Sequence, residues 1–466
     1  MSKPEASKHG EKAASGAAAD AGAPGAARRQ PLQAPRGTHD VFAPEVGRWQ
    51  HVERATHETF ARYGFTEIRT PVFEDSAVFE KGTGADSEIV QKQMYRFTDP
   101  GGQELTLRPE GTPPVIRAYL EHGLGQSKDV DRFYYIGPMF RFERPQKGRF
   151  RQFHQVGVEA LGSESAALDA EIIDMAMAWL NGLGVAAPRL KINSVGDRDD
   201  RPAYMEKLIG AQARLLDRMS EDSQRRHQVN PLRVFDSKDP RDQAVIDQLP
   251  IMKDHLSAAN RDHFDEVCAC LDDWGIAYEI EPRLVRGLDY YRRTVFEITS
   301  EALGAQDALL GGGRYDGLVA QMGGDDVPGV GFAAGLERLV LALPEAPPPA
   351  ALDAYVVTAR PEVRAAALRV MRELRAAGLR CTADFKERSM KAQMKAANRS
   401  GAPAAVILGP DELAKGACTL KWMETGDQQE TPLDKLVDDL RERIPGPDAR
   451  NAGLGKRPGD SGTRPR

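Results

Sequence analysis

Charged, amide and aromatic side chains alternate along residues 132–161, whose sequence is RFYYIGPMFRFERPQKGRFRQFHQVGVEAL. Because successive side chains of a strand point to opposite faces, this segment predicts two strands with polar faces, joined by a basic loop. The polar faces carry Met139, Arg141 and Glu143 in the first strand, and Arg151, Phe153, Gln155, Gly157 and Glu159 in the second, opposite Val156 and Val158. Burying unpaired charge costs several kcal/mol per ion. Such a face therefore indicates a binding surface for a charged ligand. The alternative is an ordinary hairpin whose polar face is solvated.

The loop between these strands concentrates positive charge in a chain that is acidic overall. Residues 141–151 hold five basic side chains and one acidic side chain, Glu143, whereas the formal net charge of the chain is −6. The overall charge argues against a protein that coats nucleic acid without selection. The local charge instead indicates a polyanionic partner held at defined places, and a tRNA would meet this description.

The elements that would carry these residues indicate an α+β fold rather than a doubly wound sheet. Apolar residues recur at helical spacing over 44–63 and 165–181. A charged helical insertion is expected at about 198–260. Further strands are expected at 67–73, 104–108, 276–282, 293–299 and 307–311, and a further helix at about 330–343.

A second domain is predicted after the proline-rich segment PEAPPPAALD at 344–353. Strand-like and helix-like segments alternate from there to residue 445, which is typical of a small α/β domain. The expected strands are 354–358, 380–384, 404–408 and 417–424, and the expected helices are 361–377, 389–399 and 432–443. Residues 1–34 and 446–466 have few large apolar side chains, so both tails are predicted to be disordered.

The remaining composition indicates a protein of the cytoplasm with no membrane span. No run approaches the ~18 apolar residues that cross a bilayer, and no apolar signal region stands near the N-terminus. Cys268 and Cys270 form a CxC pair, but no Cys or His pair stands at matching ligand spacing. We therefore expect ordinary reduced thiols and no metal held by cysteine or histidine.

Two glycine clusters, GGGRYDG at 311–317 and GVGFAAG at 329–335, differ from known phosphate-binding loops. The second has the glycine spacing of a dinucleotide fingerprint, but no βαβ unit surrounds it and it is expected to open a helix. The first is not a Walker-type loop. Both are better explained as tight backbone close to a substrate.

The polar strand pair resembles motif 2 of class II aminoacyl-tRNA synthetases, and more specifically that of the histidyl-tRNA synthetase family. Five other segments share the resemblance: RGTHDVFAPE (36–45), TLRPEGT (106–112), RLVRGLDYYRRTVFE (283–297), GGGRYDGL (311–318) and GVGFAAGLERLVLAL (329–343). The family implies activation of L-histidine by ATP to histidyl-adenylate and pyrophosphate, then transfer of histidine to the 3′ end of its tRNA. It also implies an antiparallel-sheet catalytic domain at 35–347 and an anticodon-binding domain at 352–445.

The resemblance assigns roles to individual residues. Arg141 and Arg286 would flank the α-phosphate and the end of histidine that it joins, and Arg338 would hold the far end of the triphosphate, since the arginine fork matches phosphate oxygens. ATP, expected with Mg²⁺, would place adenine against Glu143 and Phe153. The histidine pocket would comprise Glu110, Gly111, Thr112 and Gln155 around the amino group, Glu159 and Tyr291 at the imidazole, and Tyr290 and Tyr315 in its wall. Tyr290 and Tyr291 are adjacent, so an extended segment would point them apart and leave Tyr290 as a possible core residue.

The partners follow from the same resemblance. Arg144, Lys147 and Arg149 would contact tRNA phosphates, and Gln146 would read a base. The segment 36–63 matches motif 1, which implies a homodimer whose interface gains apolar area from Trp49, Phe60 and Tyr63. One alternative is a catalytically inactive relative, the regulatory subunit of ATP phosphoribosyltransferase, which lacks the C-terminal domain and several substrate residues. Another is a proline or threonine synthetase of the same class, against which RGLDYY and FHQ-G-E argue.

Overall fold

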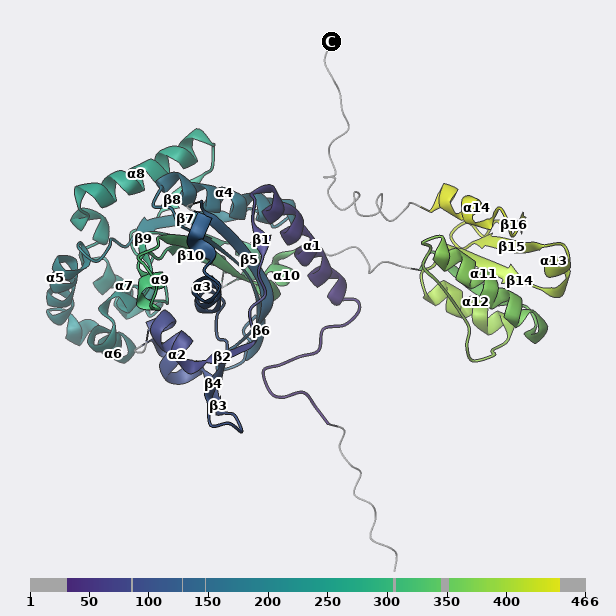
Figure 1. Ribbon diagram of the computed structural model, residues 1–466, viewed down its shortest axis with the longest axis horizontal. Helices are drawn as coiled ribbons and strands as arrows, with labels where there is room; N and C mark the ends of the chain where they lie inside the picture. The colour runs from purple at the N-terminus through teal and green to yellow at the C-terminus, as the bar shows by residue number, and fades with distance from the viewer. Residues whose placement is uncertain are drawn as a thin grey trace, which may run out of the picture. The chain divides into compact units, whose positions relative to one another are not determined.

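The computed structural model describes residues 32–84, 87–127, 129–146, 148–304, 307–344 and 352–444 (Figure 1). The tails predicted to be disordered lie outside the described residues, except for 32–34. Lys147 and most of the predicted linker lie outside them as well.

An eight-stranded sheet is the framework of the N-terminal part of the chain, in the order β1-β5-β6-β11-β10-β9-β7-β8. The strands are β1 (Thr66–Glu67), β5 (Asp131–Phe140), β6 (Gln152–Leu161), β7 (Arg189–Ser194), β8 (Tyr278–Ile280), β9 (Arg292–Thr299), β10 (Ala308–Arg314) and β11 (Gly329–Gly335). The six inner strands pair antiparallel with their neighbours. Only the short edge strands β1 and β8 pair in parallel within this sheet of the described chain. The predicted α+β class is confirmed.

Four helices cover one face of this sheet: α1 (Val46–Arg62), α4 (Ala166–Gly182), α8 (Ala258–Asp273) and α10 (Leu336–Ala342) (Figure 1). Val156 and Val158 of β6 are fully buried against them, and Trp179 of α4 stacks on Phe332 of β11 with ring centroids 6.3 Å apart. Gln155 and Glu159 point to the opposite face, toward a cavity. The predicted period-two pattern is therefore confirmed within β6, where Phe153 also lines the cavity, whereas Arg151 precedes the strand.

The helix predicted at 330–343 is wrong for its first half. Residues 329–335 form β11, which pairs antiparallel with β6 on one side and β10 on the other. An apolar run flanked by glycine does not distinguish a buried strand from a buried helix by periodicity. Two neighbouring strands supply hydrogen-bond partners for both edges of this segment, so tertiary pairing decides the outcome.

Smaller elements surround the open face of the sheet. A three-stranded sheet holds β2 (Phe73–Asp75), β3 (Tyr95–Thr98) and β4 (Glu104–Leu107). Of the strand predicted at 67–73, only the two ends belong to strands. The short helices are α2 (Ser76–Phe79), α3 (Thr112–Glu121) and α9 (Leu318–Gln321).

The charged region after β7 is helical, as predicted, with α5 (Arg201–Ala213), α6 (Glu221–Val229) and α7 (Pro240–Ile246) before α8. Helices α5 and α7, with the segments between and after them, share a hydrophobic cluster of their own, which includes Tyr204, Leu208, Val245 and Ile246. The apolar residues of α8, by contrast, join the main core beneath the sheet.

The C-terminal part is a five-stranded sheet in the order β13-β12-β14-β15-β16. Its strands are β12 (Ala354–Thr358), β13 (Cys381–Ala383), β14 (Ala404–Leu408), β15 (Ala417–Trp422) and β16 (Gln428–Pro432). Its helices are α11 (Arg364–Ala376), α12 (Met390–Arg399), α13 (Pro410–Ala414) and α14 (Leu436–Arg443). Helices α11 and α14 cover one face and α12 the other. The predicted alternation is confirmed, but β16 and α13 were not predicted, because QQETP lacks apolar alternation and α13 spans barely one turn.

No helix within the described ranges combines the length and the apolar character that crossing a membrane requires. The four cysteines are free thiols, and Cys268 and Cys270 are half-buried on α8.

Two side chains that were expected at a dimer interface lie instead in the core of this chain. Trp49 is 5% exposed and Phe60 is fully buried, both on the face of α1 that packs on the sheet. The apolar stripe of α1 attaches this helix to its own sheet, so Trp49 and Phe60 do not supply the interface area that the resemblance to motif 1 implied. Tyr63 is half-buried and donates a hydrogen bond to Asp174 at 2.7 Å.

Candidate active site

A cavity of about 290 Å³ opens on the face of the eight-stranded sheet opposite α1, α4, α8 and α10. It collects residues that are as far apart in the chain as Glu110 and Arg338. Its lining includes Glu110, Thr112, Arg141, Glu143, Arg149, Phe153, Gln155, Glu159, Arg286, Tyr290, Tyr291, Tyr315 and Arg338. The sequence-predicted adenylate residues are thus brought together, with the exception of Gly111.

Glycines on the cavity face of the strands make room for larger side chains. A Cβ at Gly311 would lie 2.0 Å from Nη2 of Arg286, and one at Gly331 would lie 2.5 Å from Oε2 of Glu159. Both distances are far below van der Waals contact, so no side chain fits at either position. The two glycine clusters are tight backbone, as predicted, and what they accommodate is the site's own charged side chains.

Glu159 lines the cavity and is 1% exposed. Its Oε1 accepts a hydrogen bond from Oγ1 of Thr112 at 2.6 Å, and its Oε2 accepts one from the hydroxyl of Tyr315 at 2.5 Å. Burial raises the pKa of Glu159 to about 8, against the effect of these two bonds, and the nearby Glu110 adds to the rise.

Glu110 is the second buried carboxyl group, and one of its partners was missed. Its Oε1 accepts from Thr83 at 2.5 Å, and its Oε2 accepts from the hydroxyl of Tyr290 at 3.0 Å. Burial raises the pKa of Glu110, opposed by Thr83, Arg141 and Tyr290. Thr83 lies in a glycine-flanked segment with no helical or strand pattern, so the sequence offers no signal for its role.

Tyr290 and Tyr291 both line the cavity, and the expectation that Tyr290 might serve only as core is wrong. Their ring centroids are 4.8 Å apart with an interplanar angle of 45°. The alternation argument fails because both residues precede β9, which begins at Arg292, and Tyr290 lies in a turn. In a turn, adjacent side chains can share one side.

Arg286 is held by a carboxylate that sequence reasoning did not single out. Its Nη1 donates to Oε2 of Glu297 at 2.8 Å, and its Nε is buried without a hydrogen-bond partner among the described residues. Glu297 is the one charged residue in the second half of the apolar strand β9, which is the signal that would have found it. A buried donor without a partner is costly, so the Nε group suits a ligand oxygen.

Arg141 and Arg338 lie at other points of the same cavity. Nε of Arg141 donates to the carbonyl of Pro109 at 2.9 Å, and its guanidinium carbon lies 5.3 Å from the ring centroid of Phe153. Nη1 of Arg338 donates to the carbonyl of Ala308 at 2.9 Å. The neighbouring Glu337 accepts from the backbone N–H of His154 at 2.9 Å, which attaches α10 to β6.

Of the two remaining residues predicted to bind histidine, Gln155 lines the cavity and Gly111 does not. Oε1 of Gln155 is buried and has no hydrogen-bond partner in the described part of the chain, so an acceptor points into the cavity. Gly111 does not belong to the described lining, and its contact with histidine stays a prediction. A Cβ there would lie 2.1 Å from Cζ of Tyr135, so Gly111 makes room for that ring.

A second groove of about 570 Å³ adjoins the cavity and shares Arg141, Glu143 and Arg149 with it. Its wall also includes Lys92, Arg144, Gln146 and Arg233. The predicted tRNA-contacting residues that the structure describes therefore lie together beside the cavity, and Lys147 lies outside the described residues.

Comparisons with known proteins agree with this arrangement. The family model described as histidyl-tRNA synthetase matches residues 37–339, and the one described as anticodon binding domain matches residues 353–443. A curated relative from Moorella thermoacetica, named histidine–tRNA ligase, is 48% identical over 412 residues, which cover 88% of this chain and 97% of the relative. One from Synechococcus elongatus with the same name is 47% identical over 410 residues, covering 88% and 94%. The solved structure of apo histidyl-tRNA synthetase from S. aureus superposes with a TM-score of 0.75 at 35% identity, covering 88% of this chain and 100% of that one.

The antiparallel sheet, the arginine-lined cavity on its open face and the separate α/β domain define the architecture of a class II aminoacyl-tRNA synthetase. Within that class, the chain belongs to the histidyl-tRNA synthetase family.

Proposed function

We propose that this chain is a histidine–tRNA ligase. It activates L-histidine with ATP to form histidyl-adenylate and pyrophosphate, and then transfers histidine to the 3′ end of its tRNA. The observation that carries this proposal is a single cavity lined both by side chains that suit phosphates and by side chains that suit an amino acid. Four arginines line it, and so do buried carboxyl, hydroxyl and amide groups that suit an amino acid.

In the first step a histidine carboxylate oxygen attacks the α-phosphorus of ATP, the bond from that phosphorus to the bridging oxygen breaks, and pyrophosphate leaves. Little covalent chemistry falls to the protein, so positioning and charge neutralisation supply the catalysis. Arg286 and Arg141 approach the α-phosphate from two sides, and Arg338 holds the pyrophosphate end. Fixed donors aimed at the developing charge stabilise the transition state more than the bound substrates.

ATP is the co-substrate, and its adenine stacks on Phe153 and bonds to Glu143. The Mg²⁺ that accompanies ATP needs few protein ligands, because this ion keeps waters and phosphate oxygens in its octahedral shell. Glu297 fits such a role, since it is 25% exposed and stands beside Arg286. The ion would neutralise charge on the leaving pyrophosphate.

Histidine selection rests on polar groups that would otherwise remain unpaired. The orphan acceptor of Gln155, together with Glu110 and Thr112, receives the ammonium group. Glu159 and Tyr291 bond the imidazole nitrogens, while Tyr290 and Tyr315 enclose the ring. A site built to bond a polar ring rejects analogues that cannot satisfy it, by large factors and without editing.

The tRNA would be gripped at two places. In the groove beside the cavity, Arg144, Lys147 and Arg149 contact phosphates of the acceptor end and Gln146 reads a base. In the C-terminal domain, Phe385 is 59% exposed and Met390 is 40% exposed, in a segment rich in lysine and arginine. Exposed aromatic surface among basic residues suits unpaired bases, which is what an anticodon presents.

The domain boundaries that we propose are 35–347 and 352–445, with a helical insertion at 198–260. Two observations support them: the separate hydrophobic cluster within the insertion and the ranges matched by the two family models. Because charging of tRNA uses cytoplasmic substrates, we also propose a cytoplasmic location.

We propose a homodimer whose interface uses the three-stranded sheet rather than the buried face of α1. Phe73 is 53% exposed and Phe97 is 42% exposed, and their ring centroids lie 6.4 Å apart. Val72 beside them is 37% exposed. Obligate interfaces bury large apolar areas, so light scattering at micromolar concentration should show about twice the chain mass of 51.1 kDa. A species of single-chain mass alone would contradict the dimer.

The alternative of a regulatory subunit without synthetase activity has less support. The C-terminal domain is present, and Glu110, Arg141, Arg286 and Arg338 are all in the cavity. Histidine-dependent exchange of labelled pyrophosphate into ATP, followed by charging of tRNA, tests the proposed function. Exchange that required histidine and not proline or threonine is the expected result, and absence of exchange from a folded protein would favour the alternative.

A further inference from the structure

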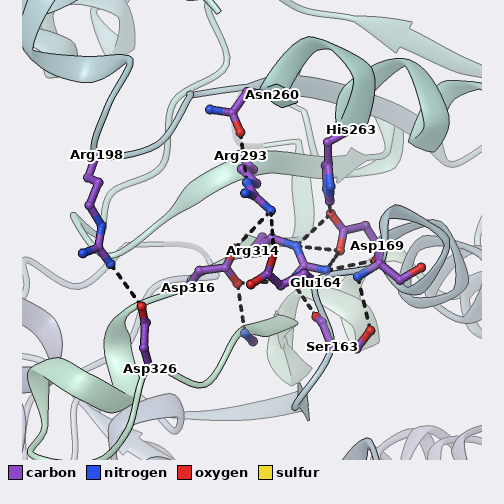
Figure 2. Close-up of polar contacts among 12 residues, drawn as sticks. Ser163, Glu164, Asp169, Arg198, Asn260, His263, Arg293, Arg314, Asp316 and Asp326 are labelled. Carbon is purple, nitrogen blue, oxygen red and sulfur yellow. Dashed lines mark hydrogen bonds and ion pairs between the residues drawn. The ribbon is translucent and has the colours of Figure 1, made fainter. Parts of the chain in front are cut away.

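A buried ion-pair network lies behind Tyr315 (Figure 2). Its central residues are Arg314 and Asp169, and neither belongs to the described cavity lining. Arg314, the last residue of β10, and Asp169 of α4 are both fully buried. Nε of Arg314 donates to Oδ1 of Asp169 at 3.0 Å, and Nη2 donates to the same oxygen at 2.5 Å. Nη1 donates to the carbonyl of Ser163 at 2.8 Å and to Oδ1 of Asp316 at 3.1 Å. Every nitrogen of this guanidinium is therefore engaged.

The network holds the residues on both sides of Tyr315. Arg314 and Asp316 flank it in sequence, and their side chains bond each other. The backbone N–H of Tyr315 donates to the carbonyl of Gly329 at 2.8 Å, and Oδ1 of Asp316 accepts from the N–H of Gly329 at 3.1 Å. The Tyr315 side chain points the other way, to Glu159. Because Arg314 and Asp316 are fixed on both sides of Tyr315, its phenol ring has little freedom to move away from Glu159.

Side chains of helices α5 and α8 contact the groups that hold two of the cavity tyrosines, Tyr315 and Tyr291. Nε2 of His263 on α8 lies 2.9 Å from Oδ2 of Asp169 (Figure 2). Nη2 of Arg201 on α5 donates to the carbonyl of Tyr291 at 2.5 Å. Two residues beyond Tyr291, Arg293 has a left-handed φ of 50° and donates to Oδ1 of Asn260 on α8 at 2.9 Å. The backbone on both sides of the histidine pocket thus depends on side chains of the helical region.

Stability alone does not explain a charged pair at this position. Apolar residues of similar volume often match or exceed the stability that a buried ion pair provides. What the pair supplies in addition is geometry, since a fork of bonds defines one backbone position for residues 314–316. A hydroxyl that moves by about 1 Å loses a good hydrogen bond.

Resting on the proposed function, we propose that Arg314 and Asp169 are positioning residues for histidine recognition. They hold the Tyr315 hydroxyl on Glu159 from behind the pocket, and His263 of α8 orients Asp169. Neither residue touches ATP or histidine, so their effect reaches the substrate only through Tyr315 and Glu159.

The test replaces the charged pair by apolar residues in the full-length protein, as Arg314→Met with Asp169→Leu. The change removes both charges of the pair together, and Asp316 keeps Arg293 at 3.9 Å and the N–H of Gly329. The variant should therefore fold, as checked by thermal melting. In pyrophosphate exchange, the KM for histidine should rise by about 5- to 100-fold, the range expected for one misplaced buried hydrogen bond. The KM for ATP should stay within about twofold, because Phe153 and Arg338 lie elsewhere in the cavity.

Two further variants show whether the effect passes through Tyr315. In a Tyr315→Phe background, removal of the pair should raise the KM for histidine no further, because the hydroxyl that it positions is gone. His263→Gln, which leaves the ion pair intact, should raise that KM by a smaller factor of about 2–5, as expected for a weakened orienting bond.

The matched control is the ion pair of Arg380 with Asp353 in the C-terminal domain, whose Nη2 and Oδ1 are 3.0 Å apart. Arg380→Met with Asp353→Leu should leave both KM values unchanged.

Three results would overturn the proposal: a folded apolar variant with a wild-type KM for histidine, an equal rise in both KM values, or a full further effect in the Tyr315→Phe background. If the apolar variant does not fold, His263→Gln decides, and an unchanged KM for histidine counts against the proposal. A wild-type protein without histidine-dependent exchange would refute the proposed function instead.

Discussion

Replacing Arg286 by alanine should slow adenylate formation far more than it weakens histidine binding. The guanidinium lies over Gly311, so close that no side chain fits there, and Glu297 holds one of its arms. Its Nε is buried with no hydrogen-bond partner among the described residues. A donor fixed in this way loses little entropy when charge develops on the α-phosphate, so its contribution is larger in the transition state than in the ground state.

The size of the effect follows from what the substitution removes. Losing one preorganised donor to a developing oxyanion costs a factor of about 10²–10³ in rate. Alanine leaves Glu297 without Arg286, but Glu297 is 25% exposed and water can solvate it, so the fold should survive. Arg286→Lys should recover only part of the rate, since a single ammonium cannot reproduce the planar fork.

Single-turnover formation of histidyl-adenylate is the direct assay, with pyrophosphate exchange for the steady state. Arg132 offers a matched control, because its side chain is 24% exposed and it pairs with Glu171 at 2.5 Å outside the described cavity lining. Arg132→Ala should leave the rate near wild type. The reasoning is refuted if Arg286→Ala keeps near-normal exchange, or if its loss appears entirely in the KM for histidine. Transfer from preformed adenylate to tRNA should be comparatively spared.

Two other predictions concern the same site, and a third concerns the C-terminal domain. Burial raises the pKa of Glu159 to about 8, so the folded protein holds a proton that the unfolded chain releases near 4.5, and this group lowers the stability of the fold as the pH rises between those values. The Glu159→Gln variant should therefore melt several degrees above wild type at about pH 9 and no higher than wild type at about pH 5. A difference in melting temperature that did not depend on pH would contradict the raised pKa. Gly311→Ala should displace Arg286 and lower the rate of pyrophosphate exchange by about 10- to 100-fold. In the control Gly210→Ala, the added Cβ would meet no described heavy atom within 4 Å, so the exchange rate should not change and the fold should be equally or slightly more stable. Equal effects in both variants would show that Arg286 has room to move. Truncation after residue 347 should leave exchange intact in a folded fragment and sharply reduce charging of tRNA, and charging equal to that of the full chain would refute anticodon reading by the C-terminal domain.

Local pattern determined much of this protein from the sequence alone. Alternation along β6 identifies which side chains face a ligand, because a strand has only two faces and one of them, with Val156 and Val158, is plainly apolar. Helical stripes in α1 and α4 and the alternation after residue 352 predict elements close to those observed. The motif residues that resemble the family then identify most of the cavity lining.

Only the tertiary structure decided which groups meet across the chain and which conformation an ambiguous segment takes. GVGFAAG becomes a strand because β6 and β10 pair with both of its edges, and Tyr290 joins Tyr291 in the pocket because they precede β9 at a turn. The partners of the charged groups, Thr83 for Glu110, Glu297 for Arg286 and Asp169 for Arg314, are 27, 11 and 145 residues away in the chain. Spacing in sequence carries no information about such pairs, since packing brings them together and the desolvation of buried charge makes their pairing necessary.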